Sequence, residues 1–168
     1  MKTVVIGSDH AGLEAKEFIK KRLEKWDYRV EDAGPYRLDP ADDYPDYVEK
    51  VALKVLEGRG RRGVLSCGTG IGASIAANKI PGIRAALVSN VEEARLSRAH
   101  NDANLLVLRG WGYDQKELPK ILKAWLEGKF EGGRHRRRVS KITAIEKKYL
   151  SACPEDSEDS KNSTEKRG

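Results

Sequence analysis

The sequence is poor in the features that mark secreted and membrane-spanning proteins. Its 168 residues include two cysteines, Cys67 and Cys153, which are too few for a disulfide framework. No apolar run approaches the roughly 18 residues of a membrane-spanning helix, and Met1–Gly7 lacks a signal-peptide pattern. We therefore expect a protein of the reducing cytosol with no membrane partner.

The chain has little net positive charge outside one segment. The chain has a formal net charge of +6, and residues 134–148 alone hold seven Lys or Arg side chains against Glu146. This segment could be a solvated helix face or an RNA-binding patch. It lacks interleaved aromatic residues, however, so we expect no nucleic-acid partner. Arg134 and Arg138 are four residues apart on a predicted helix, so both can reach one phosphate group.

Apolar segments alternate between strand and helix patterns along most of the chain. This order predicts an α/β protein, a three-layer α/β/α Rossmann-like fold with a five-stranded parallel sheet and a C-terminal basic helix. We expect one domain over residues 1–150, followed by a polar, disordered tail over 151–168. The predicted strands are 3–8, 28–32, 63–65, 84–89 and 104–108, and the predicted helices are 11–26, 44–56, 75–79, 91–99, 114–126 and 134–149.

A glycine-rich turn, Ser66–Ser74, links the third strand to a helix, and missing residues exclude several of its usual functions. A P-loop needs Lys and then Ser or Thr after the last glycine, but Ala73 and Ser74 follow. A dinucleotide site needs an acidic residue at the end of the next strand, which ends instead in Ser89-Asn90. A phosphatase loop would need Arg at the position of Ala73. What the turn does have is a thiol, Cys67, and a hydroxyl, Thr69.

Cys67 could be a small core residue or a reactive thiol. Its position at a strand end, beside the N–H groups of a helix terminus, predicts a lowered pKa and favours a chemical role. Asp9-His10, Cys67 to Thr69 and Ser89-Asn90 each follow a predicted strand, so they can converge at the carboxyl edge of the sheet. His100-Asn101 precedes a strand and belongs at the opposite edge, a difficulty that a second subunit would remove.

Six segments together resemble ribose-5-phosphate isomerase type B, in the sugar-phosphate isomerase family that includes galactose-6-phosphate and allose-6-phosphate isomerases. The resemblance runs from about residue 3 to residue 148. The segments are Ser8–Gly12, Cys67–Gly72, Ala76–Lys79, Gly82–Ala85, His100–Asn104 and Glu131–His135.

The resemblance implies aldose–ketose isomerisation of a sugar phosphate through a cis-enediol, in the pentose phosphate pathway, without metal or cofactor. It implies that Cys67 is the base, that Thr69 assists at the sugar oxygens and that His100 opens the furanose ring. It further implies a homodimer or homotetramer in which His100 is supplied across the interface. The implied substrate-binding residues are Asp9, His10, Gly68, Gly70, Ile71, Gly72, Ser74, Asn101, Arg134 and Arg138, with His10 and the two arginines on the phosphate.

One residue departs from the family pattern. Members often carry Arg where this chain has Trp111, and that Arg can add a phosphate contact from the partner subunit; Arg109 is the candidate substitute. Two alternatives stay open: an isomerase of a hexose 6-phosphate of the allose or galactose type, and a sugar-phosphate- or nucleotide-binding module that performs no chemistry.

Overall fold

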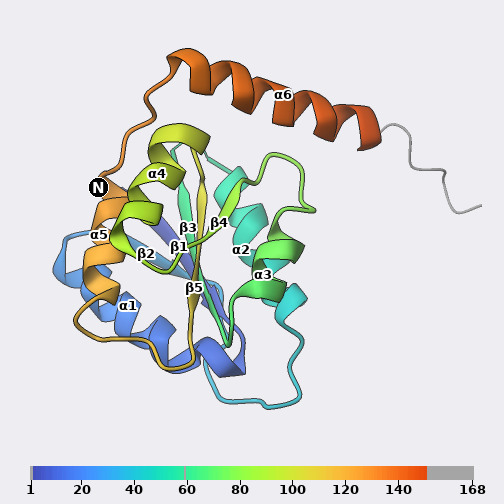
Figure 1. Ribbon diagram of the computed structural model, residues 1–168. Helices are drawn as coiled ribbons and strands as arrows, with labels where there is room; N and C mark the ends of the chain where they lie inside the picture. The colour runs from blue at the N-terminus through green and yellow to red at the C-terminus, as the bar shows by residue number, and fades with distance from the viewer. Residues whose placement is uncertain (1, 59, 151–168) are drawn as a thin grey trace, which may run out of the picture.

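The architecture is a parallel sheet covered by helices on both faces (Figure 1). The computed structural model describes residues 2–58 and 60–150. The five strands lie in the order β2-β1-β3-β5-β4, which confirms the predicted five-stranded parallel sheet. The strands are β1 (Thr3–Ser8), β2 (Arg29–Asp32), β3 (Arg62–Cys67), β4 (Ala85–Leu87) and β5 (Leu105–Arg109). The helices are the 3₁₀ turn η1 (His10–Gly12), α1 (Leu13–Lys25), α2 (Tyr44–Leu56), α3 (Ile71–Ala77), α4 (Val91–Asn101), α5 (Leu118–Glu127) and α6 (Gly133–Leu150).

The central strands are apolar on both sides because each side supports a hydrophobic core. α1, α4 and α5 pack on one face, around the fully buried Trp125. α2 and α3 pack on the other face, where Val51 and Leu105 are buried. Side chains on alternate positions of a strand point to opposite faces, so an uninterrupted apolar run such as Val4–Ile6 serves both cores.

Several boundaries differ from the predicted ones. α3 begins at Ile71, inside the glycine-rich turn, rather than at residue 75, and Cys67 is itself the last residue of β3. His100 and Asn101 form the last turn of α4 instead of following it. α5 begins at Leu118, and the preceding residues form turns.

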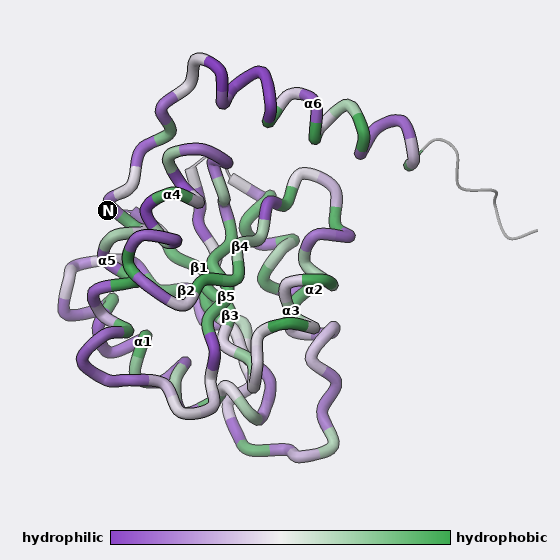
Figure 2. Tube along the Cα trace, viewed as in Figure 1, coloured by the Kyte–Doolittle hydropathy of each residue, from purple (hydrophilic) through white to green (hydrophobic). Residues whose placement is uncertain are grey.

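α6 lies apart from the sheet, across the edge at which the strands begin (Figure 1). Its sequence mixes hydrophilic and apolar residues (Figure 2), and Ile142, Ile145 and Tyr149 are exposed large apolar side chains. A cavity of about 870 Å³ lies between this face of α6 and the residues around Ile83. The predicted tail, 151–168, lies outside the described residues.

In the part of the chain that the structure describes, no helix combines the length and the apolar character needed to traverse a lipid bilayer.

Candidate active site

Two strand ends at the carboxyl edge of the sheet bring a thiol against a carboxylate. β1 and β3 pair with Ser8 opposite Ser66, so Asp9 and Cys67 lie where these neighbouring strands end. The Cys67 Sγ donates a hydrogen bond to Asp9 Oδ2 at 2.9 Å, and both residues are buried. Asp9 Oδ1 accepts a second hydrogen bond, from the Gly12 N–H at 2.8 Å. The carboxylate is therefore fixed by the backbone while its other oxygen faces the thiol.

Gly12 allows this close approach. A Cβ added at Gly12 would lie 2.0 Å from the carbonyl oxygen of Ser66, a backbone atom that has no side-chain freedom to move away. The turn after β1 thus packs directly on the end of β3, and only glycine fits at the contact.

The pKa of the Cys67 thiol is raised from its ordinary value of 9.0 to about 12. Burial is the largest cause, followed by the hydrogen bond to Asp9 and the negative charge of that residue. The backbone N–H groups of Gly70 and Ala73 act in the opposite direction but are outweighed. The predicted lowering of this pKa is therefore wrong, because burial of the sulfur and the neighbouring Asp9 carboxylate outweigh the N–H groups of the helix terminus.

The turn itself is exposed at its tip and enclosed at its sides. Thr69 is exposed, and its Oγ1 accepts a hydrogen bond from the Ile71 N–H at 3.3 Å. Gly70 has φ +79°, a conformation that suits glycine. The Trp111 ring lies over Gly68, 2.9 Å from where a Cβ would stand, and the Tyr44 ring lies over Gly72, 2.7 Å from where a Cβ would stand. These two half-exposed aromatic side chains form walls on either side of the turn.

A loop carboxylate holds His10. The His10 Nδ1 lies 2.5 Å from Asp42 Oδ1, and the Asp42 side chain is buried. The hydrogen bond to Asp42 raises the pKa of His10, and the charges of Asp42, Asp9 and Asp39 act in the same direction. His10 is therefore biased toward the imidazolium form, which suits an anionic ligand.

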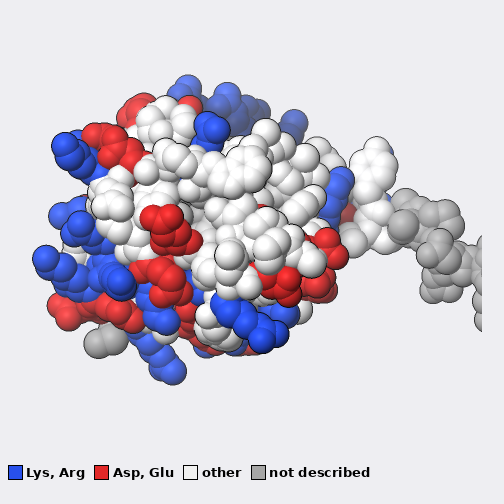
Figure 3. Space-filling view, turned by 90° about the horizontal axis from the view of Figure 1, so that it is seen from below, with Lys and Arg blue, Asp and Glu red and all other residues white. Residues whose placement is uncertain are grey.

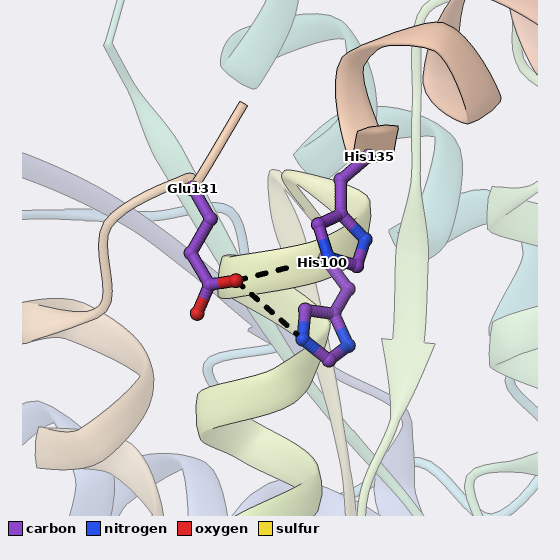
Figure 4. A group of neighbouring side chains, drawn as sticks. All are labelled: His100, Glu131 and His135. Carbon is purple, nitrogen blue, oxygen red and sulfur yellow. Dashed lines mark ion pairs between the residues drawn. The ribbon is translucent and has the colours of Figure 1, made fainter. Parts of the chain in front are cut away.

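The remaining predicted site residues form a second cluster at the opposite edge of the sheet. His100 and Asn101 end α4, and Arg134 and Arg138 belong to the first turns of α6. Both helices reach the edge at which the strands begin (Figure 1). The His100 ring stacks on the ring of His135, with centroids 4.1 Å apart, and Glu131 faces both rings (Figure 4). This position agrees with the expectation from sequence that His100 lies at the other edge.

Within one chain, the predicted site residues thus form two separate clusters. The carboxyl-edge cluster contains Asp9, His10, Cys67, Gly68, Thr69, Gly70, Ile71, Gly72 and Ser74, and the α4/α6 cluster contains His100, Asn101, Arg134 and Arg138.

The carboxyl-edge cluster is unsuited to hold a phosphate alone. Figure 3 looks onto this edge and shows uncharged side chains in its middle with carboxylates beside them. Asp9, Asp39 and Asp42 surround His10 closely enough to raise its pKa, so a phosphate there would meet three negative charges. Arg109, exposed and opposite Cys67 on β5, is one cation of the same chain at this edge.

Three neighbours of the turn escaped the sequence analysis. Asp42 belongs to a loop without strand or helix periodicity, so nothing in its pattern places it against His10. Tyr44 begins the predicted helix 44–56, but that pattern does not place its ring over Gly72. Trp111 was noted only as a departure, whereas it covers Gly68 and its N–H donates to the Gly68 carbonyl at 3.1 Å.

Comparisons with known proteins point to one family. The sequence profile of the Ribose/Galactose Isomerase family matches residues 4–142. Ribose-5-phosphate isomerase B of Escherichia coli is 43% identical over 148 residues, which cover 88% of this chain and 99% of that protein.

Solved structures with the same fold carry related names. Ribose-5-phosphate isomerase B of Clostridium thermocellum superposes with a TM-score of 0.84 at 48% identity, covering 88% of this chain and 99% of that one. The enzyme of Mycoplasma genitalium, solved with bound ribulose 5-phosphate, gives a TM-score of 0.83 at 42% identity, covering 86% and 96%.

Proposed function

This chain belongs to the ribose/galactose isomerase family, and from that premise we propose that it interconverts ribose 5-phosphate and ribulose 5-phosphate through a cis-enediolate. The observation that carries the proposal is the buried Cys67 thiol, hydrogen-bonded to Asp9 on a turn whose amides face the sulfur. A module that only binds sugar phosphates has no use for a thiol–carboxylate pair on its ligand turn.

The raised pKa of Cys67 defines how the thiol acts as a base. In the resting enzyme the sulfur carries its proton, and Asp9 Oδ2 lies 2.9 Å away to accept it. With that proton on Asp9, the thiolate removes a proton from C2 of the open-chain aldose, and the electron pair moves onto the carbonyl oxygen. A proton passes from the C2 hydroxyl to the oxyanion at O1. The sulfur then returns the abstracted proton to C1 as the carbonyl forms at C2, which yields the ketose, and the sulfur recovers its own proton from Asp9.

The turn supplies the complementary charge. The enediolate is an oxyanion, and backbone N–H groups between Gly68 and Ser74 stabilise it without reorganising. Thr69, exposed at the tip of the turn, contacts the sugar oxygens. A thiolate of high pKa is a strong base, which suits removal of a weakly acidic proton from carbon.

Each complete site requires two copies of the chain. The carboxyl-edge cluster provides the base and His10, whereas His100, which opens the furanose ring, and the phosphate-binding Arg134 and Arg138 come from the second copy. The three carboxylates around His10 support this arrangement, because a phosphate at that edge needs cations from elsewhere.

Exposed apolar side chains support a homodimer or a larger homo-oligomer. Ile71 and Ile75 on α3 and Val91 at the start of α4 are exposed. On α6, Ile142, Ile145 and Tyr149 border the cavity beneath that helix. Apolar patches of this kind mark subunit contacts. A catalytic thiol must stay reduced, which supports a cytoplasmic setting.

The proposal is tested with a panel of pentose and hexose phosphates in deuterated water. The expected result is deuterium uptake at C1 or C2 with ribose 5-phosphate, reduced by orders of magnitude in Cys67→Ala while phosphate-ligand affinity stays similar. Faster turnover of an allose or galactose 6-phosphate would instead assign the hexose activity, and unchanged turnover in Cys67→Ala would reject the base.

A further inference from the structure

Two histidines and a glutamate from three separate segments converge beside α6 (Figure 4). His100 comes from the last turn of α4, Glu131 from the connection between α5 and α6, and His135 from the first turn of α6. Glu131 Oε2 lies 3.7 Å from the Nε2 of His100 and 3.7 Å from the Nε2 of His135. One donor atom from each residue lies within 4.8 Å of the other two.

The backbone holds this group together. The Glu131 N–H donates to the Ala99 carbonyl at 3.0 Å, which ties the connection to α4 next to His100. The His135 N–H donates to the Gly132 carbonyl at 2.9 Å. His135 is buried, so one donor is fixed, while the His100 side chain, 35% exposed, has room to turn.

The donor set and spacing suit a divalent transition metal. Two imidazoles and a carboxylate are a common three-ligand set for zinc, which leaves the fourth position open. Donors bound at about 2.0–2.1 Å in a tetrahedron stand about 3.3 Å apart. The two 3.7 Å distances from Glu131 therefore need a closure of only a few tenths of an ångström, and the two imidazole donors, which lie within 4.8 Å of each other, need a larger one.

One rearrangement is required. The two rings are parallel, with an interplanar angle of 2°, so their in-plane lone pairs do not yet meet at one point. A turn of the exposed His100 ring about its own axis brings its Nε2 toward Glu131. The ion must also displace Arg134, whose Nε donates to His135 Nε2 at 3.3 Å.

We propose that His100, Glu131 and His135 bind a divalent transition metal ion such as Zn²⁺, and that this ion inhibits the isomerase. The inhibitory part rests on the proposed function. An ion bound to His100 Nε2 blocks the nitrogen that opens the sugar ring. Displacement of Arg134 also removes a cation from the phosphate site. The ion is a regulator of this site and takes no part in the proton transfers at Cys67.

Binding is measured first, without substrate. Zn²⁺ is titrated calorimetrically into the full-length, tag-free protein in phosphate-free buffer, for wild type, Glu131→Gln and the control Glu127→Gln. Glu127 is a similarly exposed carboxylate on α5 that pairs with Lys123. We expect one ion per chain, an affinity at least tenfold lower in Glu131→Gln, and no change in Glu127→Gln. Equal affinity in wild type and Glu131→Gln, or no stoichiometric binding, would overturn the proposal.

A second variant tests whether the Cys67 thiol is a metal ligand, and a second metal ion identifies the ligand types. Cys67→Ser must bind Zn²⁺ as wild type does; loss of the ion in this variant would assign the metal to the sulfur and refute the site. Co²⁺ bound to two imidazoles and a carboxylate lacks the sulfur charge-transfer band that a thiolate ligand would produce. His135→Asn, which keeps His100, must also lose the ion, and thermal midpoints verify that each variant folds.

Inhibition is then assayed separately. With one equivalent of Zn²⁺, conversion of ribose 5-phosphate is expected to fall at least tenfold and to recover on addition of a chelator. Stoichiometric binding without inhibition would refute the regulatory role. A protein that binds Zn²⁺ as described but isomerises no sugar phosphate would instead refute the proposed function and leave the metal site intact.

Discussion

The Cys67–Asp9 pair makes an unusual prediction: removing the carboxylate makes the thiol more reactive and the enzyme less active. With a pKa of about 12, only about one thiol in 10⁴ is ionised at pH 8, against about one in ten for a thiol of pKa 9. In Asp9→Asn the negative charge is gone, while the amides of Gly70 and Ala73 still face the sulfur. The pKa of Cys67 should therefore fall, although burial, the largest cause of its rise, still holds it above its ordinary value.

The assay follows alkylation of Cys67 by iodoacetamide between pH 6 and 10. It uses a Cys153→Ser background, so that Cys67 is the only cysteine that can be alkylated. We expect Asp9→Asn to alkylate at least tenfold faster at pH 8, while turnover drops by at least a hundredfold because the acceptor of the thiol proton is lost. Asp39→Asn is the matched control, since this exposed loop carboxylate is not among the groups that raise the pKa of Cys67.

Two results would refute this reasoning. The first is a wild-type alkylation profile with a midpoint at or below pH 9. The second is an Asp9→Asn enzyme whose alkylation rate and turnover change in the same direction.

Three further predictions concern pH, phosphate binding and ring opening. The pKa of Cys67 is higher in the folded than in the unfolded chain, so its contribution to the free energy of unfolding is complete below about pH 9. This contribution declines as pH rises toward 12, by at most about 4 kcal/mol. Urea unfolding should show this loss in wild type and a flatter pH profile in Cys67→Ser. Asp42→Asn removes the main cause of the raised pKa of His10, so KM at pH 7.5 should rise several-fold with kcat little changed. Equal KM values in wild type and Asp42→Asn would argue against His10 as a phosphate ligand. His100→Ala should lose more activity with ribose 5-phosphate, which is a closed furanose, than with open-chain ribulose 5-phosphate, and a uniform loss would remove the ring-opening role.

Much of the fold was predictable because it depends on local patterns. The apolar run of β1 predicts a strand, and the helical period of residues 44–56 predicts a helix. The chain order alone places His100 at the edge of the sheet opposite to that of Cys67. Alternation of strands and helices then fixes the parallel sheet and the edge at which ligands bind.

The electrostatics of the site were not predictable in this way. The pKa of Cys67 depends on Asp9, 58 residues earlier in the chain, and on the depth at which both lie. Asp42 reaches His10 from a loop whose path no periodicity describes. The residue types of the site could be read from the sequence, but their protonation depends on distances that only the folded chain supplies.

The proposed division of one active site between two chains is most directly tested by complementation. Cys67→Ala is co-expressed with Arg134→Ala/Arg138→Ala, and the heterodimer is isolated through two different tags. Each parent is expected to be inactive or nearly so, whereas the heterodimer retains one intact site of two and about half of the wild-type activity. The control pairs Cys67→Ala with Asp9→Asn, which damages the carboxyl-edge cluster of both chains and should restore nothing. A heterodimer of the first pair that stays as inactive as its parents would contradict the shared site.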